Sequence, residues 1–303
     1  MKRRNFVQLG CLAGLSSGGL FTAPMCRAME PIQRPGPSQL RVSLAAYSLR
    51  KLLQPAGDKP AEMDLFEFVD YCHEHGLAGA ELTSYYFPAD VDDAYLLKLK
   101  RHCHLRGVSI SGGAIRNDFT QVDPLAVAQD VAHTRAWVDN YAKLGAPAIR
   151  IFAGKPIAGE ETSKTLARCA QICQLACSHA AEQGVMLALE NHGGVTARAE
   201  GLLEIVRQVE SPAFGVNFDS GNFNSSDDPY QELEMIAPYA VNAQIKVEMR
   251  IGGVALPTDL ARVVQILRQA NYSGWVALEY EAAADPLQAI PGYLKQLKEL
   301  ADG

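Results

Sequence analysis

The sequence predicts an α/β protein, a single (β/α)8 TIM barrel preceded by a cleavable signal segment. Two observations lead to this fold. Eight short apolar segments recur at spacings of roughly 27 to 40 residues, and longer stretches with helical periodicity lie between them. Eight strand–helix units over about 260 residues close naturally into a barrel. A doubly wound open sheet is the alternative, but no Gly-rich nucleotide-binding fingerprint follows the first apolar segment.

The eight expected strands share β-branched or small apolar residues, with Gly or Pro nearby. In chain order they are residues 41–46, 78–82, 107–113, 146–154, 184–190, 214–219, 241–246 and 275–280. The expected helices repeat apolar residues every three or four positions, and several end in Gly at the helix C-cap. The clearest of them are residues 64–76, 94–107, 130–145, 165–184 and 259–274.

The first 28 residues differ from the rest of the chain. They combine a basic start with a weakly apolar, Gly-rich stretch and contain no acidic residue. This pattern predicts an export signal, and Arg3-Arg4 indicates the twin-arginine type, cut after Ala28, with the periplasm as destination. A basic N-terminus without a signal function is the alternative. The apolar stretch is too short to predict a stable membrane span. Residues 29–40 form a Pro-rich lead-in, and residues 41–303 form the barrel.

The net charge and the number of cysteines disfavour two classes of protein, nucleic-acid-binding proteins and disulfide-rich proteins. The formal net charge is −6, and loss of residues 1–28 takes it to −10. An acidic chain disfavours nucleic acid as a partner, since phosphate binding needs a basic face. Five cysteines remain after that cut, an odd number that does not indicate a disulfide framework. Three of them, Cys169, Cys173 and Cys177, share one helix face, where buried packing is favoured over a cysteine metal site.

Polar side chains gather at the C-terminal ends of the expected strands, where TIM barrels carry their active sites. Along the chain these are Glu81, Arg116, Glu190, His192, Asp219, Gln244, Lys246, Glu279 and Glu281. Four of them fall one per consecutive strand: Glu190, Asp219, Gln244 and Glu279. Carboxylate and amide oxygens suit Mn²⁺ or Mg²⁺ better than Zn²⁺, so this set predicts a metal site. Acids at solvated strand ends are the alternative.

The alternation of side chains along each strand predicts which of them point into the barrel. If Asp219 points inward, so does Asn217, and if Gln244 points inward, so do Asn242 and Lys246. A barrel interior that contains two asparagines is unusually polar. These amides need hydrogen-bond partners or a ligand, because an unpaired polar group is costly to bury.

Six segments together resemble the xylose isomerase-like TIM barrels, the sugar-phosphate isomerase/epimerase superfamily. They are "GAEL", "AIRNDF", "LGAPAIRIFAG", "LENHGG", "NFDSGNF" and "LEYE", within roughly residues 40–300. In ketose 3-epimerases of that superfamily, a Glu, an Asp, a His and a Glu on strands five to eight hold the metal. The resemblance gives three of these places to Glu190, Asp219 and Glu279, but the strand-seven place is Gln244 rather than His.

The resemblance implies further positions. The epimerases place an Arg shortly after the strand-seven ligand, where Arg250 is the candidate, and a second His at the position of Asn222. The implied cofactor is a divalent metal, with Mn²⁺ the first choice and Mg²⁺ or Co²⁺ as alternatives. The remaining expected substrate-binding residues are Glu81, Arg116, His192 and Lys246.

The implied activity is that of a metal-dependent sugar isomerase or epimerase. It would move a proton next to a carbonyl through an enediolate, with Glu190 and Glu279 as the two carboxylates. The same enolisation in a 3-keto-glycoside eliminase or hydrolase is one alternative. A non-catalytic sugar-binding barrel is another, because Gln244 replaces a histidine. The expected partner is a small sugar or sugar derivative, and barrels of this family often pair as homo-oligomers.

Overall fold

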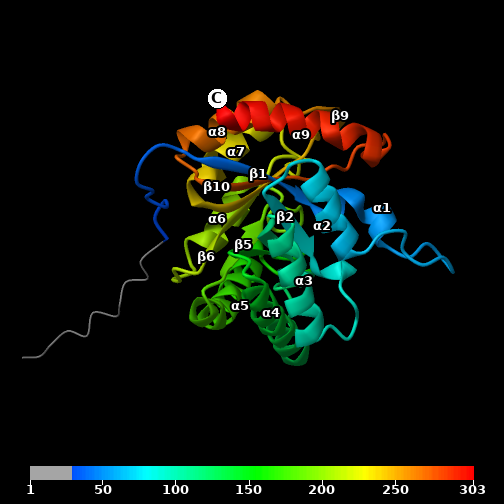
Figure 1. The fold of residues 1–303 in the computed structure, drawn as a ribbon. Coiled ribbons are helices and arrows are strands. Elements are labelled where there is room, and N and C mark those ends of the chain that lie inside the picture. Colours follow the sequence, from blue (N-terminus) through cyan, green and yellow to red (C-terminus); the bar gives the residue numbers. More distant parts are fainter. Residues whose placement is uncertain (1–28) are drawn as a thin grey trace, which may run out of the picture.

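The computed structural model describes residues 29–303, so the export signal predicted for residues 1–28 lies outside the described residues. Eight parallel strands form a closed barrel with helices on its outside (Figure 1). The barrel strands are β1 Leu40–Ala45, β2 Gly79–Thr83, β3 Ser109–Ala114, β4 Ala148–Ile151, β5 Met186–Glu190, β6 Phe214–Asp219, β7 Ala240–Ile245 and β10 Gly274–Leu278. Each overlaps one predicted strand, and the predicted barrel is confirmed.

Most of the helices that surround the barrel begin at an aspartate. Aspartates cap α2, α3, α4, α7, α8 and α9, each accepting hydrogen bonds from backbone N–H groups of the first turn. The helices are α1 Arg50–Leu53, α2 Leu65–Glu74, α3 Asp93–Leu105, α4 Pro124–Leu144, α5 Thr162–Gln183, α6 Ala199–Val206, α7 Pro229–Ile236, α8 Leu260–Gln269 and α9 Pro286–Asp302. Within residues 29–303, no helix has both the length and the apolar composition needed to cross a membrane.

Within the described residues, three 3-10 turns complete the helical elements: η1 Ala46–Leu49, η2 Ser84–Tyr86 and η3 Ala237–Tyr239. The cysteine face of α5 is buried, and all five cysteines of the described residues are free. The predicted role of Cys169, Cys173 and Cys177 as small core residues is therefore confirmed.

The alternation of side chains along each strand determines which residues point into the barrel. Leu189, Phe218, Ile245 and Leu278 have no exposed surface and pack in the layer between barrel and helices. Their neighbours in the chain point inward instead. Parallel pairing sets Asp219 beside Gln244 and Glu190 beside Asn217 at the C-terminal end of the barrel. The polar residues of β5, β6 and β7 therefore converge at one end of the barrel.

A hairpin after the seventh barrel strand was not predicted. It consists of β8 Glu248–Ile251 and β9 Val254–Pro257, which pair antiparallel. Gly252 and Gly253 form its turn with φ angles of 57° and 82°, conformations that favour glycine. The two glycines between alternating residues are the sequence signal that was available. The hairpin carries Arg250, the candidate for the arginine shortly after the strand-seven ligand.

The lead-in lies against the opposite end of the barrel. Arg34 donates a hydrogen bond to the carbonyl oxygen of Ala240, the first residue of β7, and its guanidinium stacks on Tyr272. The backbone N–H of Ile32 donates to the carbonyl of Pro238. The lead-in therefore covers the N-terminal ends of strands, away from the polar residues described above.

Candidate functional site

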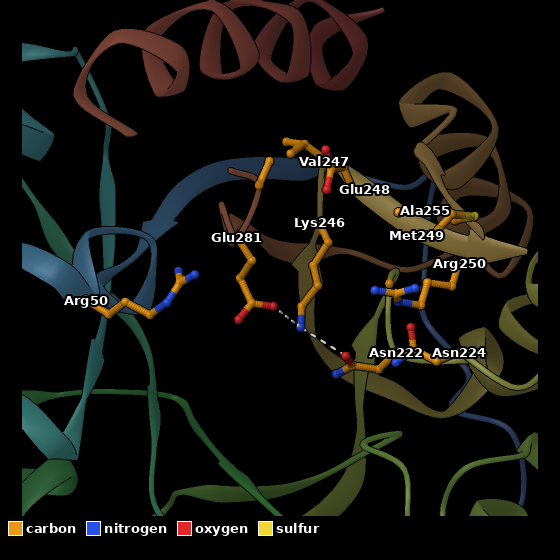
Figure 2. Close-up of a pocket in the computed structure, with 12 residues that line it drawn as sticks. Arg50, Asn222, Asn224, Lys246, Val247, Glu248, Met249, Arg250, Ala255 and Glu281 are labelled. Carbon is orange, nitrogen blue, oxygen red and sulfur yellow. Dashed lines mark hydrogen bonds and ion pairs between the residues drawn. The ribbon is translucent and has the colours of Figure 1, made fainter. Parts of the chain in front are cut away.

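Two adjoining cavities open at the C-terminal ends of the strands. The strand-end pocket has a volume of about 310 Å³ and is lined by Tyr47, Tyr85, Arg116, Arg150, Phe152, Glu190, His192, Asn222, Lys246, Glu279 and Glu281. The hairpin pocket, also about 310 Å³, is lined by residues of the β8–β9 hairpin, by Arg50 and by residues that follow β6, β7 and β10 (Figure 2). The two pockets share Asn222, Lys246 and Glu281. A larger groove of about 840 Å³ between α4 and α5 contains none of the predicted site residues.

A closed ring of hydrogen bonds lies below the strand-end pocket, inside the barrel. Gln244 Nε2 donates to Glu81 Oε1 at 2.5 Å, and Asn242 Nδ2 donates to Glu81 Oε2 at 2.9 Å. Asn217 Nδ2 donates to Gln244 Oε1 at 2.6 Å, and Asn242 Nδ2 also donates to Asn217 Oδ1 at 2.8 Å. The carboxylate accepts on both oxygens and so fixes the orientation of both amides. The polar interior predicted from strand alternation thus satisfies its own hydrogen bonds.

This amide ring predicts a stability effect. Glu81→Leu should lower the free energy of unfolding by about 1–3 kcal/mol, because Asn242 and Gln244 each lose a buried acceptor. Urea unfolding measures it. In the double variant Glu81→Leu/Gln244→Leu, the loss should be smaller than the sum of the single losses, since removing both partners leaves fewer unpaired groups. Strictly additive losses would contradict the ring.

Strand β4 contributes an arginine that pairs with Glu190. Arg150 Nε lies 2.8 Å from Glu190 Oε2, and both side chains are almost fully buried. Arg150 Nη1 donates to the carbonyl oxygen of Ile115 at 2.7 Å, and its guanidinium lies 3.8 Å from the centre of the Phe152 ring. These contacts place the guanidinium of Arg150 beside the Glu190 carboxylate, where the ion pair can orient it.

The end of β5 is also fastened to β6. Asn191 Nδ2 donates to the carbonyl oxygen of Asp219 at 2.9 Å, and the Asp219 backbone N–H donates to Asn191 Oδ1 at 3.0 Å. The polar residues of the segment "ENHGG" therefore have different structural roles. Asn191 joins two strand ends, while Glu190 and His192 line the pocket.

Lys246 follows β7 directly and lies among acidic side chains. Its Nζ is 2.6 Å from Glu281 Oε2 and 3.4 Å from both Asp219 Oδ2 and Glu279 Oε2. It also donates to Asn222 Oδ1 at 3.0 Å, and Asn222 Nδ2 in turn donates to Glu190 Oε1 at 2.7 Å. Figure 2 shows Lys246 between Glu281 and Asn222. Asn222 thereby connects the lysine to Glu190.

The electrostatics of the pocket follow from burial and from these charges. Burial raises the pKa of Glu190 to about 7, against the opposing effect of Arg150. Burial is also the main cause that raises the pKa of Asp219 well above its ordinary value. Desolvation of the ring beside the pocket, with the nearby cations Lys246 and Arg150, lowers the pKa of His192 to about 4. The imidazole is therefore neutral near pH 7 and suited to hydrogen bonding with a hydroxyl group.

Lys246 keeps its charge in this setting. Burial opposes that charge, but the carboxylates around it outweigh burial, and the pKa of Lys246 lies well above its ordinary value. The carboxylates that do so include Asp219, Glu279 and Glu281. The strand-end pocket thus contains a permanent cation.

The structure brings most of the predicted site residues together. Those that line the strand-end pocket are Glu190, His192, Asn222, Lys246, Glu279 and Arg116. Asp219 contacts Lys246 from beside the pocket. Glu81 and Gln244 lie below it in the amide ring, and Glu81 has no exposed surface with which to contact a substrate. Arg250 lines the hairpin pocket and not the strand-end pocket, and its Nη1 donates to the carbonyl oxygen of Gly253.

Sequence reasoning missed several pocket residues. Arg150 was detectable as a single charged residue at an inward position of an otherwise apolar strand. Tyr85 lies in η2 beyond β2, and Phe152 lies just beyond β4, so both follow the same strand-end rule as the predicted residues. Arg116 stacks on Tyr85. Tyr47 follows β1, and no pattern in its segment distinguishes it from a core residue.

The four expected metal ligands do not form one shell as they lie. Both amide atoms of Gln244 take part in the ring, and both oxygens of Glu190 have partners in Arg150 and Asn222. Asp219 and Glu279 face the Lys246 ammonium. Among residues 29–303, no three His, Cys, Asp or Glu side chains are grouped so that they could hold a metal ion. The side chains in this arrangement therefore do not fit a divalent ion at these four residues.

Comparisons with known proteins show which family and which solved structures the chain resembles. Residues 69–300 match a family described as Xylose isomerase-like TIM barrel, and no curated protein matches the chain. A solved xylose isomerase domain protein from Planctomyces limnophilus is 18% identical, with 88% of this chain and 98% of that chain covered and a TM-score of 0.65.

Two further solved structures have the same fold. The IOLI protein with a binding zinc atom is 15% identical, with 86% and 96% covered and a TM-score of 0.69. A 3-keto-D-glucoside 4-epimerase from E. coli is 14% identical, with 86% and 100% covered and a TM-score of 0.68. At these identities, each likeness is one of fold.

Proposed function

The chain belongs to the xylose isomerase-like TIM barrel family, and from this membership we propose that it is an enzyme that isomerises or epimerises a sugar or sugar derivative. One observation carries the proposal. Glu190 and Glu279, on β5 and just after β10, line the same pocket beside the fixed cation Lys246. Two carboxylates at one pocket can take a proton from a carbon next to a carbonyl and return it.

The pocket residues have separate tasks on this proposal. One carboxylate removes the proton, the electron pair moves onto the carbonyl oxygen, and a carboxylate then returns the proton to the same or the neighbouring carbon. Arg150 positions Glu190. The neutral His192 and the guanidinium of Arg116 bind hydroxyl groups, and Tyr85 and Phe152 offer aromatic surface to the sugar ring. The pocket volume, about 310 Å³, lies at the small end of the range for ligand pockets.

The family resemblance and the zinc atom named for one solved neighbour support a divalent metal in this site. An ion held by Glu190, Asp219, Gln244 and Glu279 would supply a Lewis acid at the carbonyl oxygen. It would need Gln244 to leave the amide ring, Glu190 to release a partner and Lys246 to withdraw. The residues in place do not fit it, so the proton transfer described above uses side chains alone. Mn²⁺ as the particular ion stays a prediction.

The hairpin pocket favours a second candidate reaction. It adjoins the strand-end pocket through Asn222, Lys246 and Glu281, and so offers space for a group attached to the reacting sugar. A 3-keto-glycoside would place its keto ring in the strand-end pocket and its second group under the hairpin. Removal of the proton next to the carbonyl would then form a C=C bond as the neighbouring C–O bond to that group breaks, and the group would leave as an alcohol after its oxygen takes up a proton.

A product screen separates these candidates. Wild-type protein is mixed with keto-sugars and with 3-keto-glycosides, and the mixtures are followed by NMR. A new stereoisomer or a ketose–aldose pair supports the isomerase or epimerase. A released second group supports the eliminase. Binding of a sugar without any conversion would support a non-catalytic sugar-binding barrel and contradict the enzyme. Export through residues 1–28 and assembly into a homo-oligomer remain predictions, as does the absence of a nucleic-acid partner.

A further inference from the structure

Lys246 occupies the centre of the acidic cluster at the strand ends. Four oxygens from the C-terminal ends of β6 and β10 and the loops after them surround its Nζ: those of Glu281 and Asn222 within 3.0 Å, and those of Asp219 and Glu279 at 3.4 Å. Figure 2 shows the side chain extended from the end of β7 toward this point. The arrangement is a coordination shell of oxygens, filled by an ammonium group.

The resemblance implies four metal ligands, and two of them point toward the Lys246 ammonium instead. They are Asp219 and Glu279. The other two are turned to other partners, Gln244 to the amide ring and Glu190 to Arg150. A divalent ion bound between Asp219 and Glu279 would lie close to the positive charge of Lys246, and like charges at that separation repel strongly.

We propose that the ammonium group of Lys246 is the resident cation of this site and stands where the resemblance places a divalent metal ion. Its place in the cluster follows from the contacts above and does not depend on any activity. Its role in the reaction rests on the proposed function. As a proton leaves carbon for Glu190 or Glu279, the electron pair moves onto the carbonyl oxygen, and an N–H of Lys246 donates to that oxygen. The proton then returns to carbon, and the lysine ends unchanged.

The test is a titration of the full chain with Mn²⁺ alone, after removal of metal with EDTA, followed by calorimetry. Lys246→Met keeps a side chain of similar length without the charge, and leaves Asp219, Glu279 and Glu281 as oxygen ligands around the vacated position. We expect this variant to bind one Mn²⁺ per chain with a Kd about tenfold or more below that of the wild type. The matched control is Lys164→Met, an exposed lysine on α5 whose nearest carboxylate is 3.8 Å away, which should leave Mn²⁺ binding unchanged.

Gln244→His supplies a second, independent variant. With Lys246 in place it should change the Kd for Mn²⁺ little, whereas Lys246→Met/Gln244→His should bind most tightly of the set. Wild-type protein that binds one Mn²⁺ as tightly as Lys246→Met would overturn the proposal. So would a large gain from Gln244→His alone.

The result stays decisive if Lys246→Met does not fold. Tight binding of one Mn²⁺ by the wild type would then overturn the proposal, and no binding up to about 1 mM, which corresponds to about −4 kcal/mol, would support it. The readout is metal binding, so it is separate from the proposed function. A protein that converts no sugar would contradict that function and leave the metal titration as it stands.

Discussion

Glu190→Gln and Glu279→Gln should each lower turnover by about 10²–10⁴-fold, the usual contribution of a positioned acid or base. Glutamine keeps the shape of glutamate but cannot take a proton from carbon. Both carboxylates line the strand-end pocket, and each is nearly buried. The measurement is kcat on the sugar found in the product screen, with circular dichroism to confirm that the barrel is folded.

A matched control distinguishes the loss of a pocket carboxylate from the loss of any negative charge on the protein. Glu299→Gln changes an exposed residue of α9, whose nearest cation is Lys295 at 4.0 Å, and should leave kcat unchanged. Full activity in either pocket variant would remove the two-carboxylate mechanism. A loss in only one of them would indicate that a single carboxylate transfers the proton in both directions.

Arg150→Met should lower the free energy of unfolding by about 3–5 kcal/mol. The arginine and its partner Glu190 are both almost fully buried, so the change leaves a carboxylate in the barrel without its cation. The loss of the contact with Phe152 adds to the effect. Urea unfolding measures it, and the exposed Arg101→Met on α3 is the control, with a change within about 0.5 kcal/mol.

A double variant separates the ion pair from the packing of Arg150. Arg150→Met/Glu190→Leu removes both charges, so it should recover a large part of the stability lost in Arg150→Met. If the double variant loses as much free energy of unfolding as the two single variants lose together, the ion pair does not account for the loss in Arg150→Met. Arg150→Met that unfolds at the same urea concentration as the wild type would show that Glu190 does not depend on Arg150.

The barrel was predictable because its signals are local. Strand and helix periods, glycine C-caps and the order of elements are all present in short segments of the sequence. The alternation of Asn217 with Phe218 and of Gln244 with Ile245 also predicted which side chains point inward, since the side-chain period of a strand is two. The strand-end rule also predicted that Glu190 and Glu279 lie at the C-terminal end of the barrel, where both line the strand-end pocket.

The partners of these residues were not predictable in the same way. Arg150 and Glu190 are 40 positions apart, and their contact depends on the register between β4 and β5. The amide ring joins Glu81 to Gln244 across the barrel, over 163 positions. The position of Lys246 among acids depends on where β7 ends and how far its side chain extends. Such contacts follow from the closed barrel, which no single segment specifies.

Exchange of substrate hydrogen with solvent tests the central claim most directly. Keto-sugars and 3-keto-glycosides are incubated in D2O with wild-type protein and with Glu190→Gln, and deuterium at the carbon next to the carbonyl is followed by NMR. We expect the wild type to introduce deuterium at that carbon and Glu190→Gln to do so about 10²–10⁴-fold more slowly. A wild-type protein that binds one of these sugars but introduces no deuterium would contradict proton transfer as the function of this site.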